Sequence, residues 1–203
     1  TSTTTGVLVA SPGTTWTIRD LTVEKFFDFS DVKPGDIGED TISLHVDNND
    51  SYLCADVTLT SDDDNGSNDP EALAGDVTDG VGVGELGDNV NFMWWADDGD
   101  NVYEADESTI SGGVKSLLDL ATTSGAFSVA LADKTHNAWG TPGPVLAGTA
   151  FIAKAWCFGT IGSAPLAQDG LGTTSLRTPG NSTGGITCNG SALGNETQTD
   201  SLT

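Results

Sequence analysis

Residues 29–70, FSDVKPGDIGEDTISLHVDNNDSYLCADVTLTSDDDNGSNDP, contain the pattern that predicts the fold class. Apolar and polar side chains alternate along 42–47 and again along 55–60, which is the period of a strand with one buried face. Turn-forming residues precede the first of these strands and separate the two, so we predict a hairpin. The second strand leads into Asp62, Asp63 and Asp64, which places carboxylate oxygens on the loop that follows.

The rest of the chain continues the β pattern. Further strands are expected in three apolar segments: 89–96, 126–132 and 149–159. The first of these carries large side chains on both faces, so it is either buried on both sides or exposes a patch for a partner. A short helix is expected after an N-cap at Asp69, where proline and glutamate follow, and another within 111–121.

These elements predict an all-β fold with long acidic loops and one or two short helices. We expect roughly eight to ten strands in such a fold. We divide the chain into an N-terminal segment, 1–14, and one domain, 15–203. From about residue 162 the domain is rich in Gly, Ser and Thr and poor in large apolar side chains.

The composition narrows the classes of partner. The chain has 30 acidic residues against seven Lys and Arg, a formal net charge of −23. Nucleic acid is therefore excluded as a partner, because phosphate binding needs clustered basic side chains. No apolar run reaches the roughly 20 residues of a membrane span. The Thr-rich start without a signal peptide is what we expect of a mature secreted, extracellular protein.

The three cysteines are an odd number, which in an extracellular chain indicates one internal bridge and one thiol with a partner elsewhere. Cys157 and Cys188 enclose the Gly/Ser/Thr-rich region. A disulfide between them would join this poorly cored region to the last strongly apolar strand. Cys54 would then be free or joined to another chain.

Two acidic clusters, in 62–71 and in 97–107, are candidate calcium sites. Calcium takes six to eight oxygen ligands, and crowded carboxylates need either a cation or disorder. The spacing does not complete an EF-hand pattern, so an ordinary solvated acidic loop is the alternative for each cluster. The residues that we select as ligands are Asp62, Asp64, Asn65, Asp69, Asp97, Asp98, Asp100, Glu104 and Asp106.

The sequence gives little sign of catalysis. His45 and His136 are the only histidines, and neither lies in a metalloprotease motif. No nucleophile-elbow motif occurs, so we expect no enzymatic activity. Four tryptophans could form a platform for carbohydrate, but their apolar surroundings favour packing in a core or an interface: Trp94, Trp95, Trp139 and Trp156.

Four segments in this order resemble the TasA/camelysin family of secreted bacterial and archaeal proteins, whose precursors are processed by a SipW-like signal peptidase. They are DVKPGDIGEDTISLHVDNNDSYLCADVTLTSDDDNG (31–66), WWADDGDNVYEADE (94–107), AKAWCFGT (153–160) and NETQTDSLT (195–203). The resemblance covers most of the chain from about Phe27 onward. It implies a jelly-roll-like antiparallel β-sandwich with Greek-key connections. Such a domain would polymerise with copies of itself into extracellular filaments of the biofilm matrix.

In such filaments the subunits are joined by donor-strand complementation, a form of β-augmentation. The resemblance favours a donor strand in the segment 1–10, with these residues: Thr5, Val7, Leu8 and Val9. The alternatives for this segment are a first strand of its own domain or a frayed end. We therefore expect a filament subunit stabilised by calcium. A camelysin-like protease and a calcium-dependent carbohydrate-binding module are the alternative functions.

Overall fold

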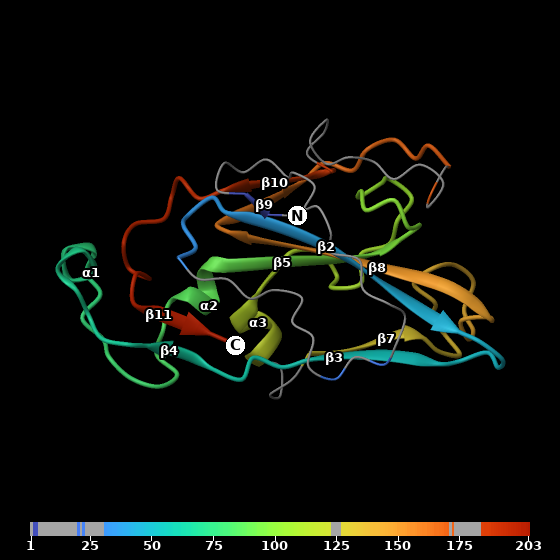
Figure 1. The fold of residues 1–203 in the computed structure, drawn as a ribbon, viewed down its shortest axis with the longest axis horizontal. Coiled ribbons are helices and arrows are strands. Elements are labelled where there is room, and N and C mark those ends of the chain that lie inside the picture. Colours follow the sequence, from blue (N-terminus) through green and yellow to red (C-terminus); the bar gives the residue numbers. More distant parts are fainter. Residues whose placement is uncertain are drawn as a thin grey trace.

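The computed structural model describes residues 2–3, 20, 22, 31–122, 127–170, 172 and 184–203, and Figure 1 shows their arrangement. The largest sheet is antiparallel and has the strand order β1-β2-β8-β5-β6. Its strands are β1 (Ser2–Thr3), β2 (Ile37–Val46), β8 (Gly148–Phe158), β5 (Val90–Asp97) and β6 (Lys115–Ser116). The predicted all-β class is confirmed, whereas the finer jelly-roll assignment stays a prediction.

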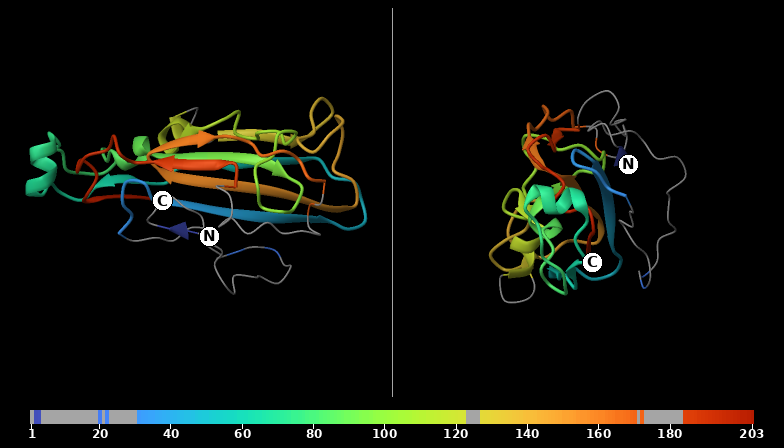
Figure 2. Two further views of the ribbon diagram at one scale, coloured as in Figure 1. Left: turned by 90° about the horizontal axis from the view of Figure 1, so that it is seen from above. Right: turned by 90° about the vertical axis from the view of Figure 1, so that its left-hand side faces the viewer.

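Three smaller antiparallel pairs flank this sheet. They join β3 (Leu53–Val57) to β7 (Phe127–Ala132), β4 (Asp62–Asp64) to β11 (Asp200–Leu202), and β9 (Thr160–Ser163) to β10 (Ile186–Asn189). The pairs β3–β7 and β4–β11 lie along one side of the main sheet, and β9–β10 lies along the other (Figures 1 and 2).

Strand β5 is therefore buried on both faces. This is the first of the two alternatives that the large side chains of 89–96 left open. On one face, Met93 and Trp95 pack in a core that includes Ile161 of β9 and Ile186 of β10. On the other face, Trp94 packs against the cluster that extends to β3 and β7. Large side chains on both faces are thus used in two separate cores, and they form no exposed patch on this strand.

The predicted hairpin of residues 42–47 and 55–60 is wrong. Strand β2 pairs with β8 along its whole length, whereas β3 pairs with β7 in another layer. Leu44 and Ala55 still face the same core, but from opposite sheets. In the segment that follows β2, Ser51 exchanges backbone hydrogen bonds with Val145, which precedes β8. Alternation fixes which face of a strand is buried, but it does not fix which strand is its neighbour.

Three short helices complete the described elements: α1 (Asp69–Ala74), α2 (Leu86–Asn89) and α3 (Leu117–Thr122). The N-cap of α1 is Asn68 and not Asp69, because Asn68 and Glu71 form a reciprocal capping box. Gly75 ends this helix at a φ of 105°. No helix in the described ranges is long and apolar enough to span a bilayer.

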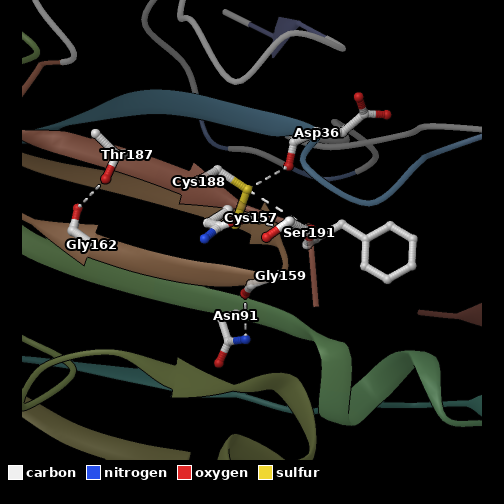
Figure 3. Close-up of a disulfide and its surroundings, with 10 residues drawn as sticks. Asp36, Asn91, Cys157, Gly159, Gly162, Thr187, Cys188 and Ser191 are labelled. Atoms are coloured by element: carbon white, nitrogen blue, oxygen red, sulfur yellow. Dashed lines mark hydrogen bonds between the residues drawn. A yellow bond between two sulfur atoms is a disulfide. The ribbon is translucent and has the colours of Figure 1, made fainter. Parts of the chain in front are cut away.

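The predicted disulfide between Cys157 and Cys188 is confirmed. Figure 3 shows that it joins β8, at the centre of the main sheet, to β10. The bridge holds the β9–β10 pair over the face that carries Trp95, where β9 and β10 supply part of the core. Cys54 lies exposed on β3 as a free thiol.

We predict that Cys188→Ser lowers the free energy of unfolding by about 3–4 kcal/mol, the chain-entropy value for a closed loop of this size. Thermal or chemical unfolding without reductant measures the change. Cys54→Ser is the matched control, and its effect should stay within about 0.5 kcal/mol because the exposed thiol constrains nothing. Equal stabilities of Cys188→Ser and the wild type would contradict the structural role of the bridge.

Candidate metal centre

The loop 97–107 begins where β5 ends and folds back over the main sheet. Three of its carboxyl side chains are buried: Asp97 is 2% exposed, and Asp100 and Glu104 are 0% exposed. Tyr103 packs its ring edge-on against Trp95 with 5.5 Å between ring centroids. The contact between Tyr103 and Trp95 thus holds the acidic loop against the sheet, and the three carboxylates lie beneath the surface of the protein.

The backbone of this loop depends on two residues with positive φ, Gly99 at 108° and Asn101 at 69°. Asparagine tolerates this left-handed conformation better than most other side chains. The Asn101 amide also donates to a Glu39 oxygen at 2.9 Å, and its own oxygen accepts a hydrogen bond from the Thr41 hydroxyl. Both partners belong to β2, so the loop is fixed to the strand at the far side of β8.

The loop brings its acids together in two adjoining sets. Asp97, Asp98 and Glu107 each offer a carboxylate oxygen within 4.8 Å of the others, and so do Asp98, Asp100 and Glu104. Asp98 belongs to both sets. Acidic groups in this arrangement can hold a metal ion, with ligands from one short stretch of chain.

Asp97 provides a second sign that the group is built for a cation. Its Oδ2 accepts hydrogen bonds from the backbone N–H groups of Gly99 and Asn101, at 3.0 and 3.3 Å. Its Oδ1 is buried and has no hydrogen bond of good geometry. Oδ1 of Asp98 is likewise buried and accepts no hydrogen bond. Burial raises the pKa of Asp97 to about 6 although the two amides and the nearby Trp95 indole N–H oppose the shift. Buried carboxylate oxygens without donors are costly unless a cation or a proton neutralises them.

Glu107 is held in place by two backbone donors. Its oxygens accept from the N–H of Asp98 at 2.9 Å and from the N–H of Glu104 at 2.8 Å. Burial raises the pKa of Glu107 to about 8, and the charge of Asp97 adds to the shift. Burial, and then the charge of Asp97, also raises the pKa of Glu39. These shifts mean that a neutralising proton or cation is favoured at the group.

The ligand types select the class of metal. The grouped side chains offer only oxygen, which suits hard cations such as calcium, whereas zinc prefers nitrogen and sulfur. His45 and His136 are both exposed and lie outside the acidic groups. The wide and flexible coordination shell of calcium tolerates carboxylates of irregular spacing better than the strict octahedron of magnesium does.

A second acidic group lies at the other end of the main sheet. It joins Asp64 of β4, Glu85 just before α2, and Asp200 of β11, with one oxygen of each within 4.8 Å of the others. Asp64 and Asp200 lie directly opposite each other in the β4–β11 pair. Only Asp64 of this group was selected from the sequence as a ligand.

The structure thus brings together five of the nine side chains that the sequence selected: Asp64, Asp97, Asp98, Asp100 and Glu104. The other four lie elsewhere. Asp62 accepts a hydrogen bond from the Gly87 amide of α2 at 3.1 Å, and the Asn65 amide donates to the Thr199 carbonyl. Asp69 is exposed in the first turn of α1. Asp106 is exposed and accepts from Gln168, which also donates to Asp98.

Three grouped carboxylates were not selected from the sequence: Glu85, Glu107 and Asp200. Glu107 stands within the predicted acidic loop, so its cluster was recognised although its role was not. Asp200 reaches Asp64 only through the pairing of β11 with β4, for which the sequence carries no local signal. The residues selected for a donor strand, Thr5, Val7, Leu8 and Val9, lie outside the described residues.

A cleft of about 690 Å³ adjoins the first acidic group. Asp97 and Asp98 lie at one side of it, and the segment 137–151 lines the rest. Trp139 is part of this lining, and its indole N–H donates to the Phe151 carbonyl at 2.7 Å. The indole edge is thus engaged by the protein's own backbone.

Comparison of the chain with protein-family models, curated proteins and solved structures finds no match. The chemistry of the site therefore rests on its own residues. These residues are carboxylates gathered in the loop 97–107 and between β4, β11 and the start of α2.

We predict that the metal-free protein loses stability as pH rises from about 4.5 to 8. A carboxyl group with a raised folded-state pKa stabilises fully below its unfolded value, about 4. That contribution is lost as pH rises through the folded value, about 6 for Asp97 and about 8 for Glu107. Thermal unfolding in chelator across this range should show the decline, and added calcium should reduce it.

The variant Glu107→Gln should show a smaller decline than the wild type, because the amide does not titrate. Asp106→Asn is the control, since that carboxyl is exposed on the same loop. A decline that is equal in the wild type, Glu107→Gln and Asp106→Asn would assign the effect to the overall negative charge and contradict this prediction.

Proposed function

We propose that this protein is the structural subunit of an extracellular filament, in which a strand from one copy completes the sheet of the next. The observation that carries the proposal is the outer edge of β2. One edge of this ten-residue strand pairs with β8 along its full length. On the other edge, β1 pairs only with Ile37 and Gly38. Among the described residues, no strand pairs with the outer edge from Asp40 to Val46.

The direction of the backbone hydrogen-bonding groups of β2 follows from the register. The Phe158 amide donates to the Asp36 carbonyl, and these residues are in register with the β2–β8 ladder. In antiparallel sheets, alternate residues point their backbone groups to opposite neighbours. The odd-numbered residues of β2, which include Thr41, Ser43 and His45, therefore direct N–H and C=O outward. Such an edge is a template for another strand.

The register of β1 also bears on which strand can occupy this edge. Ser2 lies opposite Gly38 and Thr3 opposite Ile37, so the two strands are antiparallel. β1 therefore covers only the start of β2, and within the described part of the chain no other strand covers the positions beyond it. A second copy of the chain supplies one, and donor-strand complementation is its form.

The resemblance to the TasA/camelysin family supports the same function, because that family forms such filaments. The Cys157–Cys188 disulfide is typical of proteins outside the reducing cytosol. In this proposal calcium binds the acidic loop at Asp97, Asp98, Asp100, Glu104 and Glu107. Asn101 of the same loop contacts Glu39 and Thr41. An ion that stiffens the loop would therefore also order the edge strand.

We predict that Ser43→Pro yields monomers. Proline removes the Ser43 N–H, which points to the open edge, and leaves the pairing with β8 intact, as is tolerated on edge strands. Ser43→Ala is the matched control and should polymerise, because it keeps the backbone donor. Electron microscopy and sedimentation of the purified protein measure assembly. Deletion of residues 1–10 should also give monomers if these residues supply the donated strand, and normal filaments from Ser43→Pro would refute the edge assignment.

A second candidate function is calcium-dependent carbohydrate binding, which the cleft beside Asp97 and Asp98 favours. Calcium at these carboxylates would lie at the wall of the cleft, next to Trp139. This function predicts that the monomeric Ser43→Pro protein binds glycans on an array, and that chelator or Asp98→Asn abolishes the binding. Absence of calcium-dependent glycan binding by a folded monomer would exclude this candidate.

A further inference from the structure

The second acidic group contains more negative charge than its surroundings can balance. Asp64 and Asp200 face each other directly across the β4–β11 pair, and like charges in this position are destabilising. Glu85 adds a third carboxylate within 4.8 Å. In the part of the chain that the structure describes, no Lys or Arg forms an ion pair with any of the three.

Two of these carboxylates have one oxygen without a hydrogen-bond donor. Oδ2 of Asp200 accepts from the backbone N–H groups of Glu85 and Leu86, at 2.7 and 2.9 Å. The other oxygen, Oδ1, is buried and accepts none, and Oε2 of Glu85 is in the same state. The backbone thus aims Asp200 at the group while leaving an oxygen for a further ligand.

Asp76 is an independent sign that a cation belongs here. Its side chain is more than nine-tenths buried, and its Oδ2 has no hydrogen-bond partner. Asp76 adjoins Asp64 through Thr78, whose hydroxyl lies 2.8 Å from an oxygen of each. A hydroxyl has one proton, so it can satisfy only one of these two acceptors at a time. After burial, the charge of Asp76 is the largest cause of the raised pKa of Glu85.

We propose that Asp64, Glu85 and Asp200 bind a calcium ion that fastens the C-terminal strand β11 to β4, with Asp76 beside them as a further buried negative charge. Calcium accepts three carboxylates together with neighbouring oxygens and water in its shell of six to eight ligands. The ion turns the repulsion between Asp64 and Asp200 into attraction through a shared centre. This site is separate from the loop 97–107, and it is independent of filament assembly.

The ion has a structural consequence, because β4–β11 is a weak element without it. Each strand has three residues, and an isolated two-stranded pair is marginally stable in water. The pair is extended by backbone hydrogen bonds from Thr203 to Ser61 and from Thr60 to Thr203. Leu202 packs against the core around Trp156. Release of the ion should therefore loosen these contacts before it affects the main sheet.

Amide hydrogen exchange of the wild-type protein tests this directly, with calcium chloride as the probe and chelator as the reference. Calcium should slow exchange of the amides at 200–203 by about tenfold or more, which corresponds to about 1.4 kcal/mol or more of local stabilisation. The measurement needs no variant, so it is unaffected by folding defects. Unchanged exchange at 200–203 would overturn the proposal.

Calcium titration of variants identifies the ligands. Glu85→Gln and Asp200→Asn should each lower the affinity of one calcium ion by at least the 10–100-fold typical of outer-shell changes at metal sites. Asp79→Asn is the matched control, because Asp79 is exposed three residues from Asp76. The Asp98→Asn variant removes the loop site and leaves this ion in place. Unaltered calcium binding by both Glu85→Gln and Asp200→Asn would also overturn the proposal.

Discussion

The antiparallel ladder of β2, β8 and β5 is the constraint on which the rest of the structure depends. Strand β8 pairs with β2 on one side and β5 on the other. Its alternate side chains enter cores on both faces of the sheet. It also carries Cys157, the anchor of β10. Even the buried Lys154 is accommodated within this ladder, through an ion pair with Asp40 directly opposite it at 3.3 Å.

The ladder also determines where the acids lie. Strand β5 delivers Asp97 to one end of the sheet, and the loop that follows is fixed to β2 through Asn101. At the other end, the pairing of β4 with β11 brings Asp64 and Asp200 together. A net charge of −23 would be only a solvated surface if the acids were scattered. Here, several carboxylates are buried in groups, so the negative charge is concentrated at positions that could hold a cation.

The sequence predicted the parts of this structure that depend on local pattern. Alternation identified the strands β2 and β3, and apolar segments identified β5, β7 and β8. The acidic loop 97–107 was recognisable from composition alone. The neighbour of each strand was not predictable, because the same alternation suits a hairpin and a sandwich. Strand β11, Asp200 and Glu85 were missed for the same reason: their role exists only through contacts between distant segments. Strand β10 was likewise not predicted, because it lies in the region rich in Gly, Ser and Thr. Only the predicted disulfide placed this region against the core.

The central claim is that the outer edge of β2 is completed by another copy of the chain. Residue-resolved hydrogen exchange of β2, in the monomer and in the assembled protein, tests it most directly. The account predicts that the amides of Thr41, Ser43 and His45 exchange freely in the monomer and become protected on assembly. The even-numbered residues, which face β8, should be protected in both states. Protection of the odd-numbered amides already in the monomer, or their free exchange in the assembled protein, would contradict the account.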